Sequence, residues 1–239
     1  MNISLTTVTL GAGHDLALTR ASVLSQTLAP DRHIVVSAVP VECPGAEVHV
    51  RPARGVYDAL NYGLARSTGD VVGFLHAGDT FADPRVLADV AREFEADPAL
   101  DYLWADIRYV SGPARKPGRT LDGGALERGL LLRGIYPPHP TLYMRRAAFE
   151  SVGPYSTAYR ICGDFDYWIR LLRRSDLHGR HLPRLTVEMT TGGLSTTLAA
   201  RLWHNNREKL RVLRAQGLKA SSILLAYKYI HVLRNGKRH

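Results

Sequence analysis

The sequence predicts an α/β fold with a Rossmann-type, mainly parallel sheet flanked by helices. Strand-like segments rich in β-branched residues alternate with segments whose apolar residues recur at helical spacing. The interval between successive strands is long enough for a helical crossover, which favours parallel pairing. The length of 239 residues, 45% of them hydrophobic, allows one main core and a short appendage.

The first half of the chain shows the clearest alternation. Residues 3–9 alternate β-branched and polar side chains, as a half-buried strand does. Asp83 and Pro84 supply an N-cap and a first-turn proline for a helix that runs to about residue 95. The remaining expected elements are strands at 33–38, 47–51, 70–75 and 102–110 and helices at 16–28 and 56–65.

The second half has one segment with weak periodicity. Residues 111–134 are rich in Gly, Pro and Arg, so we expect a loop there, with at most one helical turn, that could cover a substrate. A strand at 141–144, helices near 146–151 and 164–174 and a strand near 182–188 complete the expected domain. We therefore place a domain at 1–198 and a basic helical extension at 199–239, with helices at about 197–216 and 220–234.

The net charge of +9 is concentrated in this extension. Residues 1–200 hold 21 Lys and Arg against 21 Asp and Glu, whereas residues 201–239 hold ten against Glu208 alone. An amphipathic helix lying on an anionic membrane and a helix packed on the domain with a solvated basic face both explain this pattern. No nucleic-acid partner is expected, because no aromatic platform or recognised nucleic-acid motif accompanies the charge.

Other features of the sequence indicate where the protein is located and argue against a zinc site. The chain has no apolar run of about 18 residues and no signal-peptide pattern at its start, so we expect a cytoplasmic protein, with the inner face of the cell membrane as its other expected place. Cys43 and Cys162 belong to no CxxC pair or Cys/His cluster, which argues against a zinc site or a disulfide framework.

Three short motifs follow one another in the first half: G-V-Y-D-A-L-N at 55–61, S-T-G-D at 67–70 and F-L-H-A-G-D at 74–79. The last one ends a predicted strand, and in open parallel sheets ligands bind beyond the carboxyl ends of the strands. This series resembles the family 2 glycosyltransferases, in particular bacterial members of polysaccharide and glycolipid biosynthesis with an N-S-G-D-like acidic motif. The resemblance implies a GT-A-like fold and an inverting enzyme that takes a sugar from a nucleoside diphosphate.

Such a reaction releases a diphosphate, whose charge a divalent cation neutralises. The resemblance makes Asp79 the candidate ligand for Mg²⁺ or Mn²⁺, and His76 could add a nitrogen ligand or bond the nucleotide. On spacing alone, a turn residue before the next helix is the simpler explanation of Asp79, and a structural histidine that of His76. The residues expected to bind the donor are Thr9, Arg54, Tyr57, Asp58, Asn61, His76 and Ala77.

A second block runs from H-P-T-L-Y at 139–143 through G-P-Y at 153–155 to D-F-D-Y-W-I-R-L at 164–171. It resembles the same family, and the resemblance makes Asp164 the general base, a task suited to a carboxylate. Asp164 could also be only the N-cap of its helix. The expected acceptor-site residues are His139, Asp166 and Trp168; for Asp166 an ion pair with Arg170 on the helix surface is the alternative, and for Trp168 a place in the core.

The chain departs from the family pattern at several acidic positions. Gly78 stands where the commoner motif has a second carboxylate, and Ser37 stands near a strand end that is usually acidic. Ala53 and Arg54 replace another acidic position, and Arg54 could instead pair with phosphate. The expected function is therefore metal-assisted transfer of a sugar to a glycan or a lipid-linked acceptor, with a catalytically degenerate nucleotide- or glycan-binding protein as the alternative.

Overall fold

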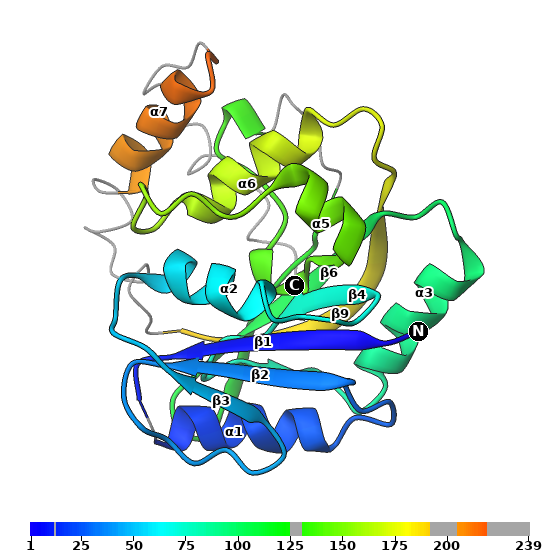
Figure 1. Ribbon diagram of the computed structural model, residues 1–239, viewed down its shortest axis with the longest axis vertical. Coiled ribbons are helices and arrows are strands. Elements are labelled where there is room, and N and C mark those ends of the chain that lie inside the picture. The colour runs from blue at the N-terminus through cyan, green and yellow to red at the C-terminus, as the bar shows by residue number, and fades with distance from the viewer. Residues whose placement is uncertain (12, 125–130, 192–204, 219–239) are drawn as a thin grey trace.

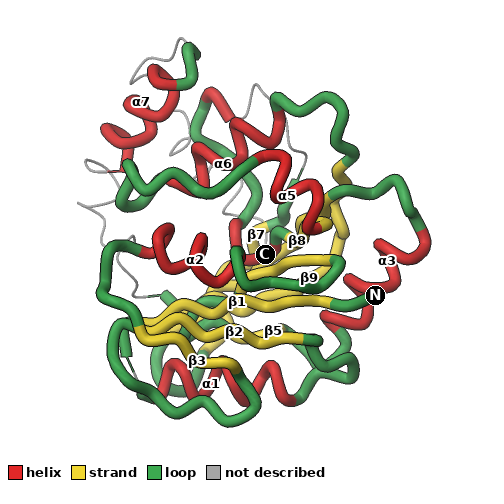
Figure 2. Tube along the Cα trace, viewed as in Figure 1, coloured by secondary structure: helices red, strands yellow, loops and turns green. Residues whose placement is uncertain are grey.

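The computed structural model describes residues 1–11, 13–124, 131–191 and 205–218. Their strands form one mixed sheet in the order β3-β2-β1-β4-β8-β6-β9-β5, with β7 paired to β6 (Figures 1 and 2). Helices α2, α5 and α6 lie on one side of this sheet and α1 and α3 on the other, while α7 lies beyond α6 (Figure 1). The predicted α/β fold with helices on both faces is confirmed.

The parallel half of the sheet comes from the first 74 residues. β1 lies between β2 and β4 and is parallel to both, and β3 continues the sheet beyond β2. Central parallel strands are covered on both faces, which explains why the middle of β1 and all of β4 are buried. The elements are β1 (Ile3–Thr9), α1 (His14–Leu24), β2 (Arg32–Ser37), β3 (Glu47–Val50), α2 (Val56–Leu64) and β4 (Val71–Phe74).

The second half adds antiparallel pairs. β8 lies antiparallel between β4 and β6, and β9 then runs parallel to β6. A short β5 follows the motif of Asp79 and pairs with β9, which brings the end of β9 to that motif. The elements are β5 (Thr80–Phe81), α3 (Val86–Ala96), β6 (Tyr102–Ser111), β7 (Lys116–Leu121), η1 (His139–Thr141), β8 (Tyr143–Arg145), α5 (Arg146–Val152), α6 (Gly163–Leu172), β9 (Gly179–Thr190) and α7 (Asn206–Ala215).

Two local predictions were wrong. Within the segment predicted to be a loop, β7 pairs with β6 in a hairpin; its side chains are exposed, so backbone pairing forms the strand without an apolar pattern that would have revealed it. The helix predicted to begin at Asp83 and Pro84 begins at Val86. Asp83 instead accepts the N–H of Arg85 at 2.8 Å, in a turn before the helix.

The core is divided by the sheet. One hydrophobic cluster packs β1, β4 and β6 against α3, and a second packs the other face against α2, α5 and α6. Val212 and Leu213 of α7 are fully buried in the second cluster, so this part of the C-terminal extension packs on the domain. The expected second tail helix lies outside the described residues. Among the helices that are described, none is long and apolar enough to cross a bilayer.

His33 gives the fold a pH-dependent stability. It lies buried in β2, hydrogen-bonded to Thr7 Oγ1 at 2.9 Å, and burial lowers its pKa from 6.5 to about 4. The unfolded chain therefore binds a proton that the folded chain excludes, so stability is lost as the pH falls from 6.5 towards 4. We expect protonation of His33 in the unfolded chain to lower the free energy of unfolding by about 2 kcal/mol at about pH 5, relative to neutral pH.

Chemical denaturation at about pH 7 and about pH 5 tests this expectation. His33→Asn keeps a polar partner for Thr7 without the titration, so its stability should fall less over this range than that of the wild type. Equal losses in the two proteins would show that His33 is not responsible.

Candidate active site

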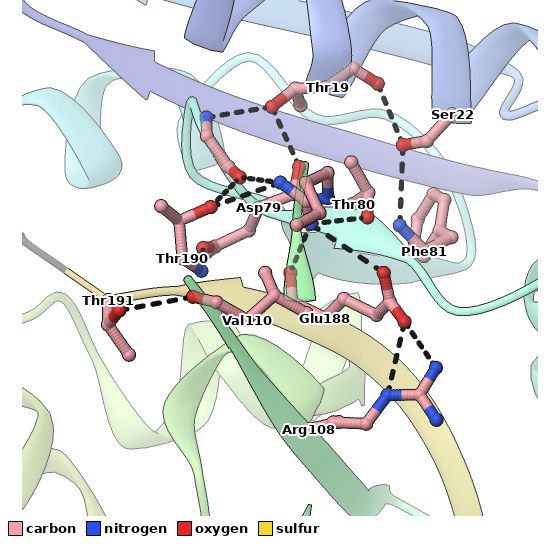
Figure 3. A network of polar contacts seen from close by, with 12 residues as sticks. Thr19, Ser22, Asp79, Thr80, Phe81, Arg108, Val110, Glu188, Thr190 and Thr191 are labelled. Carbon is pink, nitrogen blue, oxygen red and sulfur yellow. Dashed lines mark hydrogen bonds and ion pairs between the residues drawn. The ribbon is translucent and has the colours of Figure 1, made fainter. Parts of the chain in front are cut away.

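Asp79 lies at the carboxyl end of β4, in the turn that leads into β5. It is 5% exposed, and its Oδ1 accepts the N–H of Thr190 at 3.0 Å, while Thr19 Oγ1 donates to its carbonyl at 2.7 Å (Figure 3). Burial raises the pKa of Asp79 to about 7, against the opposing effects of the Thr190 N–H and of Arg115. The carboxylate is therefore held in place by hydrogen bonds but poorly compensated in charge, as suits a cation ligand.

Arg115 secures the same turn from the β6–β7 hairpin. Its guanidinium donates to the carbonyl of Gly78 at 3.0 Å, to Thr190 Oγ1 at 3.1 Å and to Thr80 Oγ1 at 2.9 Å. It thus joins the turn that holds Asp79 to the end of β9. The sequence does not reveal this residue, because an arginine in a Gly- and Pro-rich segment carries no signal of the partner that it reaches in the fold.

Asp164 lies in the first turn of α6. Its Oδ1 accepts the N–H of Phe165 at 2.7 Å and the hydroxyl of Tyr57 at 3.3 Å, and Tyr136 is a further hydrogen-bond partner. Burial raises the pKa of Asp164, and these hydrogen bonds oppose the rise. Cys162 occupies the N-cap position without a side-chain cap, so the alternative of Asp164 as a helix N-cap is wrong.

His76 and His139 form a largely buried pair of rings next to the turn that holds Asp79. Their rings stack with centroids 5.9 Å apart, and His139 Nε2 is 2.8 Å from Tyr155 Oη. Burial lowers the pKa of each histidine to about 4, so both are neutral near pH 7. The Asp164 charge acts on His76, whose carbonyl accepts the N–H of Asp79 at 3.0 Å. His76 is thus bonded through its backbone to Asp79 and lies within electrostatic reach of Asp164.

The other predicted donor-site residues take different places. Tyr57 contacts Asp164 rather than the β4 end, and Asn61 binds both backbone groups of Tyr155 at 2.8 Å. Asp58 faces Arg51 at 3.7 Å. Thr9 and Ala77 lie at the carboxyl ends of β1 and β4, where the Ala77 N–H donates to Val8 at 3.2 Å, while Arg54 is exposed beyond β3.

Asp166 and Trp168 point away from solvent. Asp166 is 3% exposed; it pairs with Arg170 at 3.0 Å and accepts a hydrogen bond from Gln216 at 2.8 Å. Trp168 is fully buried and packs edge-on against Trp104, with ring centroids 6.0 Å apart. The expected ion pair exists, but it lies inside the fold instead of on the helix surface. Both side chains support α6, and of the three expected acceptor-site residues His139 is the one that packs against His76.

Another group of side chains that could bind a metal ion lies where β6 and β9 pair. Within the described part of the chain, Asp106, Asp122 and His181 place one ligand atom each within 4.8 Å of one another. Asp106 Oδ1 already accepts the Gly123 N–H at 2.7 Å and lies 2.8 Å from His181 Nε2. Asp106 is opposite Leu185 in β9, several residues from Thr190, so this group is separate from Asp79.

Gly163 allows Tyr57 to approach Asp164. A Cβ added at Gly163 would lie 2.7 Å from the ring of Tyr57, too close for any real contact. Gly163→Ala would favour the helix by about 1 kcal/mol on propensity alone. We nevertheless expect it to lower kcat roughly ten- to a hundredfold, because the ring must leave its place beside Asp164.

The measurement is the transfer rate together with the melting temperature. Tyr57→Phe, which removes the hydroxyl that donates to Asp164, serves as the comparison and should also lower kcat. A folded Gly163→Ala variant with the kcat of the wild type would contradict this role of the Tyr57–Asp164 contact.

The sheet order, the acidic turn after the central β4 and the carboxylate in the first turn of α6 define a GT-A type of α/β protein. The chain belongs to glycosyl transferase family 2, whose family model matches residues 31–153. It is similar to solved GT-A structures, with a TM-score of 0.64, 14% identity and coverage of 95% of this chain and 71% of the other for S. aureus TarS 1-349 in complex with UDP-GlcNAc. For the mannosyltransferase PcManGT from Pyrobaculum calidifontis, in complex with GDP-Man and Mn2+, the TM-score is 0.64, the identity 15%, and the coverage 97% and 70%.

Curated relatives share part of this chain. A PGL/p-HBAD biosynthesis glycosyltransferase of Mycobacterium bovis is 32% identical over 152 residues, which cover 63% of this chain and 57% of that protein. The O-antigen biosynthesis protein RfbC of Myxococcus xanthus is 34% identical over 119 residues, which cover 47% of this chain and 9% of RfbC. The matched region is thus little more than half the length of the first relative.

Proposed function

We propose that this protein is an inverting glycosyltransferase that moves a sugar from a nucleoside diphosphate to an acceptor hydroxyl, with Asp164 as the general base. The observation that supports this proposal best is that His76 is a neighbour of both carboxylic residues: its carbonyl accepts the Asp79 N–H, and the Asp164 charge acts on its ring. One carboxylate then serves the leaving diphosphate and the other the attacking hydroxyl. The nucleotide-bound TarS and PcManGT structures of the same fold lend it further support.

The residues at the β4 end fit a divalent cation. Asp79 is a buried carboxylate whose pKa is raised to about 7, and the adjacent Gly78 has no acidic side chain. Mg²⁺ and Mn²⁺ at phosphate sites need only one or two carboxylates, because phosphate oxygens and water complete the coordination. We therefore assign Asp79 as the protein ligand of Mg²⁺ or Mn²⁺, which when bound would neutralise charge on the leaving diphosphate. His76, turned towards His139, is assigned to the wall of the site.

Asp164 performs the proton transfer. As the acceptor oxygen forms its bond to the anomeric carbon, the bond from that carbon to the diphosphate oxygen breaks and its electron pair leaves with the diphosphate. Asp164 takes the proton of the acceptor hydroxyl on the opposite side, so the configuration inverts. Tyr57 and the Phe165 N–H hold the carboxylate in position, and burial raises its pKa towards the range useful for a base.

We further propose a glycan or lipid-linked acceptor, reached on the cytoplasmic side of the membrane. The names of the relatives, which refer to PGL/p-HBAD and O-antigen biosynthesis, support this class of acceptor. The basic residues of the C-terminal extension suit contact with an anionic membrane surface.

A panel of sugar nucleotides tests the proposal, with hydrolysis and transfer measured with and without Mn²⁺ and the anomeric configuration of the product determined by NMR. Inverted product from one or a few donors is the expected result. Retained configuration would contradict the single-displacement mechanism. Tight nucleotide binding in calorimetry without turnover on any acceptor would favour a catalytically degenerate binding protein, the alternative suggested by Gly78.

A further inference from the structure

Lys209 of α7 is buried beside the proposed base. It is 3% exposed, its Nζ donates to the carbonyl of Gly134 at 3.0 Å, and it lies 4.9 Å from the ring centre of Tyr136 and 5.5 Å from that of Phe165. A lysine is rarely buried unless its charge is used, because desolvation of the ammonium group is costly. The Gly134 carbonyl and the two aromatic rings compensate part of this cost.

That region is the support of Asp164. Tyr136 is a hydrogen-bond partner of the Asp164 carboxylate, and the N–H of Phe165 donates to it at 2.7 Å. The charge of Lys209 also acts on Asp164 directly and lowers its pKa against the effect of burial. Lys209 thus contacts the rings of Tyr136 and Phe165, two of the residues that donate hydrogen bonds to Asp164. Its charge favours the ionised form of the Asp164 carboxylate.

Glu208, the adjacent residue, fixes the backbone that leads into α6. Its carboxylate accepts three consecutive N–H groups, from Arg160 at 2.8 Å, Ile161 at 2.8 Å and Cys162 at 2.7 Å. The carbonyl of Ile161 in turn accepts the hydroxyl of Tyr57 at 2.6 Å, so this carbonyl and Asp164 share the one hydroxyl proton. Three charge-assisted hydrogen bonds to one carboxylate therefore hold the loop before α6. This loop leads directly into Asp164, and its Ile161 carbonyl binds Tyr57.

We propose that α7 completes the active site: Lys209 is a positioning residue that keeps the Asp164 carboxylate ionised and in place, and Glu208 is a positioning residue for the loop that carries it. This inference depends on the proposed role of Asp164 as base. Lys209 is the one cation among the titratable groups shown to interact with Asp164 in the described part of the chain. Those groups are Tyr57, His76, Tyr136, Tyr155, Cys162 and Lys209.

The pH profile of kcat/KM in Lys209→Gln tests the proposal. Glutamine still donates a hydrogen bond to Gly134 but carries no charge, so the base should protonate at higher pH. We expect the acidic limb of the profile to move to higher pH by about one unit, with most of the activity recovered on the alkaline side. Arg214→Met removes an exposed charge from the same helix and should leave the profile unchanged.

Two comparisons separate the possible failures. If Asp164→Asn is inactive but a folded Lys209→Gln keeps the acidic limb of the wild type, the role of Lys209 is overturned and the proposed function stands. If Asp164→Asn stays active, the base assignment itself is overturned. Glu208→Gln tests the proposal if Lys209→Gln does not fold. We expect kcat to fall about tenfold at an unchanged donor KM, because the charge-assisted hydrogen bonds to the loop before α6 are weakened. An unchanged kcat would overturn the proposal.

Discussion

Asp164→Asn is expected to lower kcat by roughly two to four orders of magnitude while the affinity for the nucleotide stays close to that of the wild type. Asparagine has the shape of aspartate, and its carbonyl can still accept the N–H of Phe165 and the hydroxyl of Tyr57. Only the capacity to take the acceptor's proton is lost. Steady-state transfer rates and nucleotide titration by calorimetry measure the two quantities.

Asp166 provides the matched control on the same helix. It pairs with Arg170 at 3.0 Å and is nearly fully buried, so Asp166→Asn should lower the melting temperature more than it lowers kcat at a temperature where the protein is folded. The opposite pattern, with kcat lost in Asp166→Asn and retained in Asp164→Asn, would contradict the assignment of the base.

Asp79→Asn is expected to lower the transfer rate by about two orders of magnitude or more and to weaken Mn²⁺ binding in the presence of nucleotide. An amide oxygen can still accept the N–H of Thr190, so the turn should keep its shape. The lost negative charge is what the cation requires, because Gly78 provides no second carboxylate. Rates measured across a Mn²⁺ titration test this, and higher metal should recover part of the activity.

Asp106→Asn tests the competing metal assignment. Asp106 belongs to the group with Asp122 and His181, which lies away from the β4 end. We expect its Mn²⁺ dependence to match that of the wild type. If Asp106→Asn lost the Mn²⁺ dependence and Asp79→Asn kept it, the catalytic cation would instead be assigned to the Asp106 group on β6.

Much of the fold could be predicted because its information is local. β1, β2 and β4 are short segments rich in β-branched residues whose side chains are largely buried, and they and the more exposed β3 lie within a few residues of their predicted ranges. Asp79 and Asp164 were found through short motifs around each residue. That the two residues belong to one site is a prediction from the resemblance, since no spacing along the chain relates α6 to the end of β4.

Three supporting residues could not be predicted because their partners are distant in sequence. Arg115 reaches Gly78 and Thr190, and Glu208 and Lys209 reach the segments around α6. In the sequence, these residues are ordinary charges in a basic or Gly-rich segment, for which solvent exposure is the usual outcome. The hairpin that carries Arg115 was also missed, because a strand with exposed side chains has no hydrophobic period.

A crystal structure with Mn²⁺ and a non-reactive nucleoside diphosphate sugar tests the central claim most directly. We predict an anomalous Mn²⁺ signal at the carboxylate of Asp79, with the sugar ring between the diphosphate and Asp164. A signal at Asp106 and His181, or a sugar bound out of reach of the Asp164 carboxylate, would contradict this account.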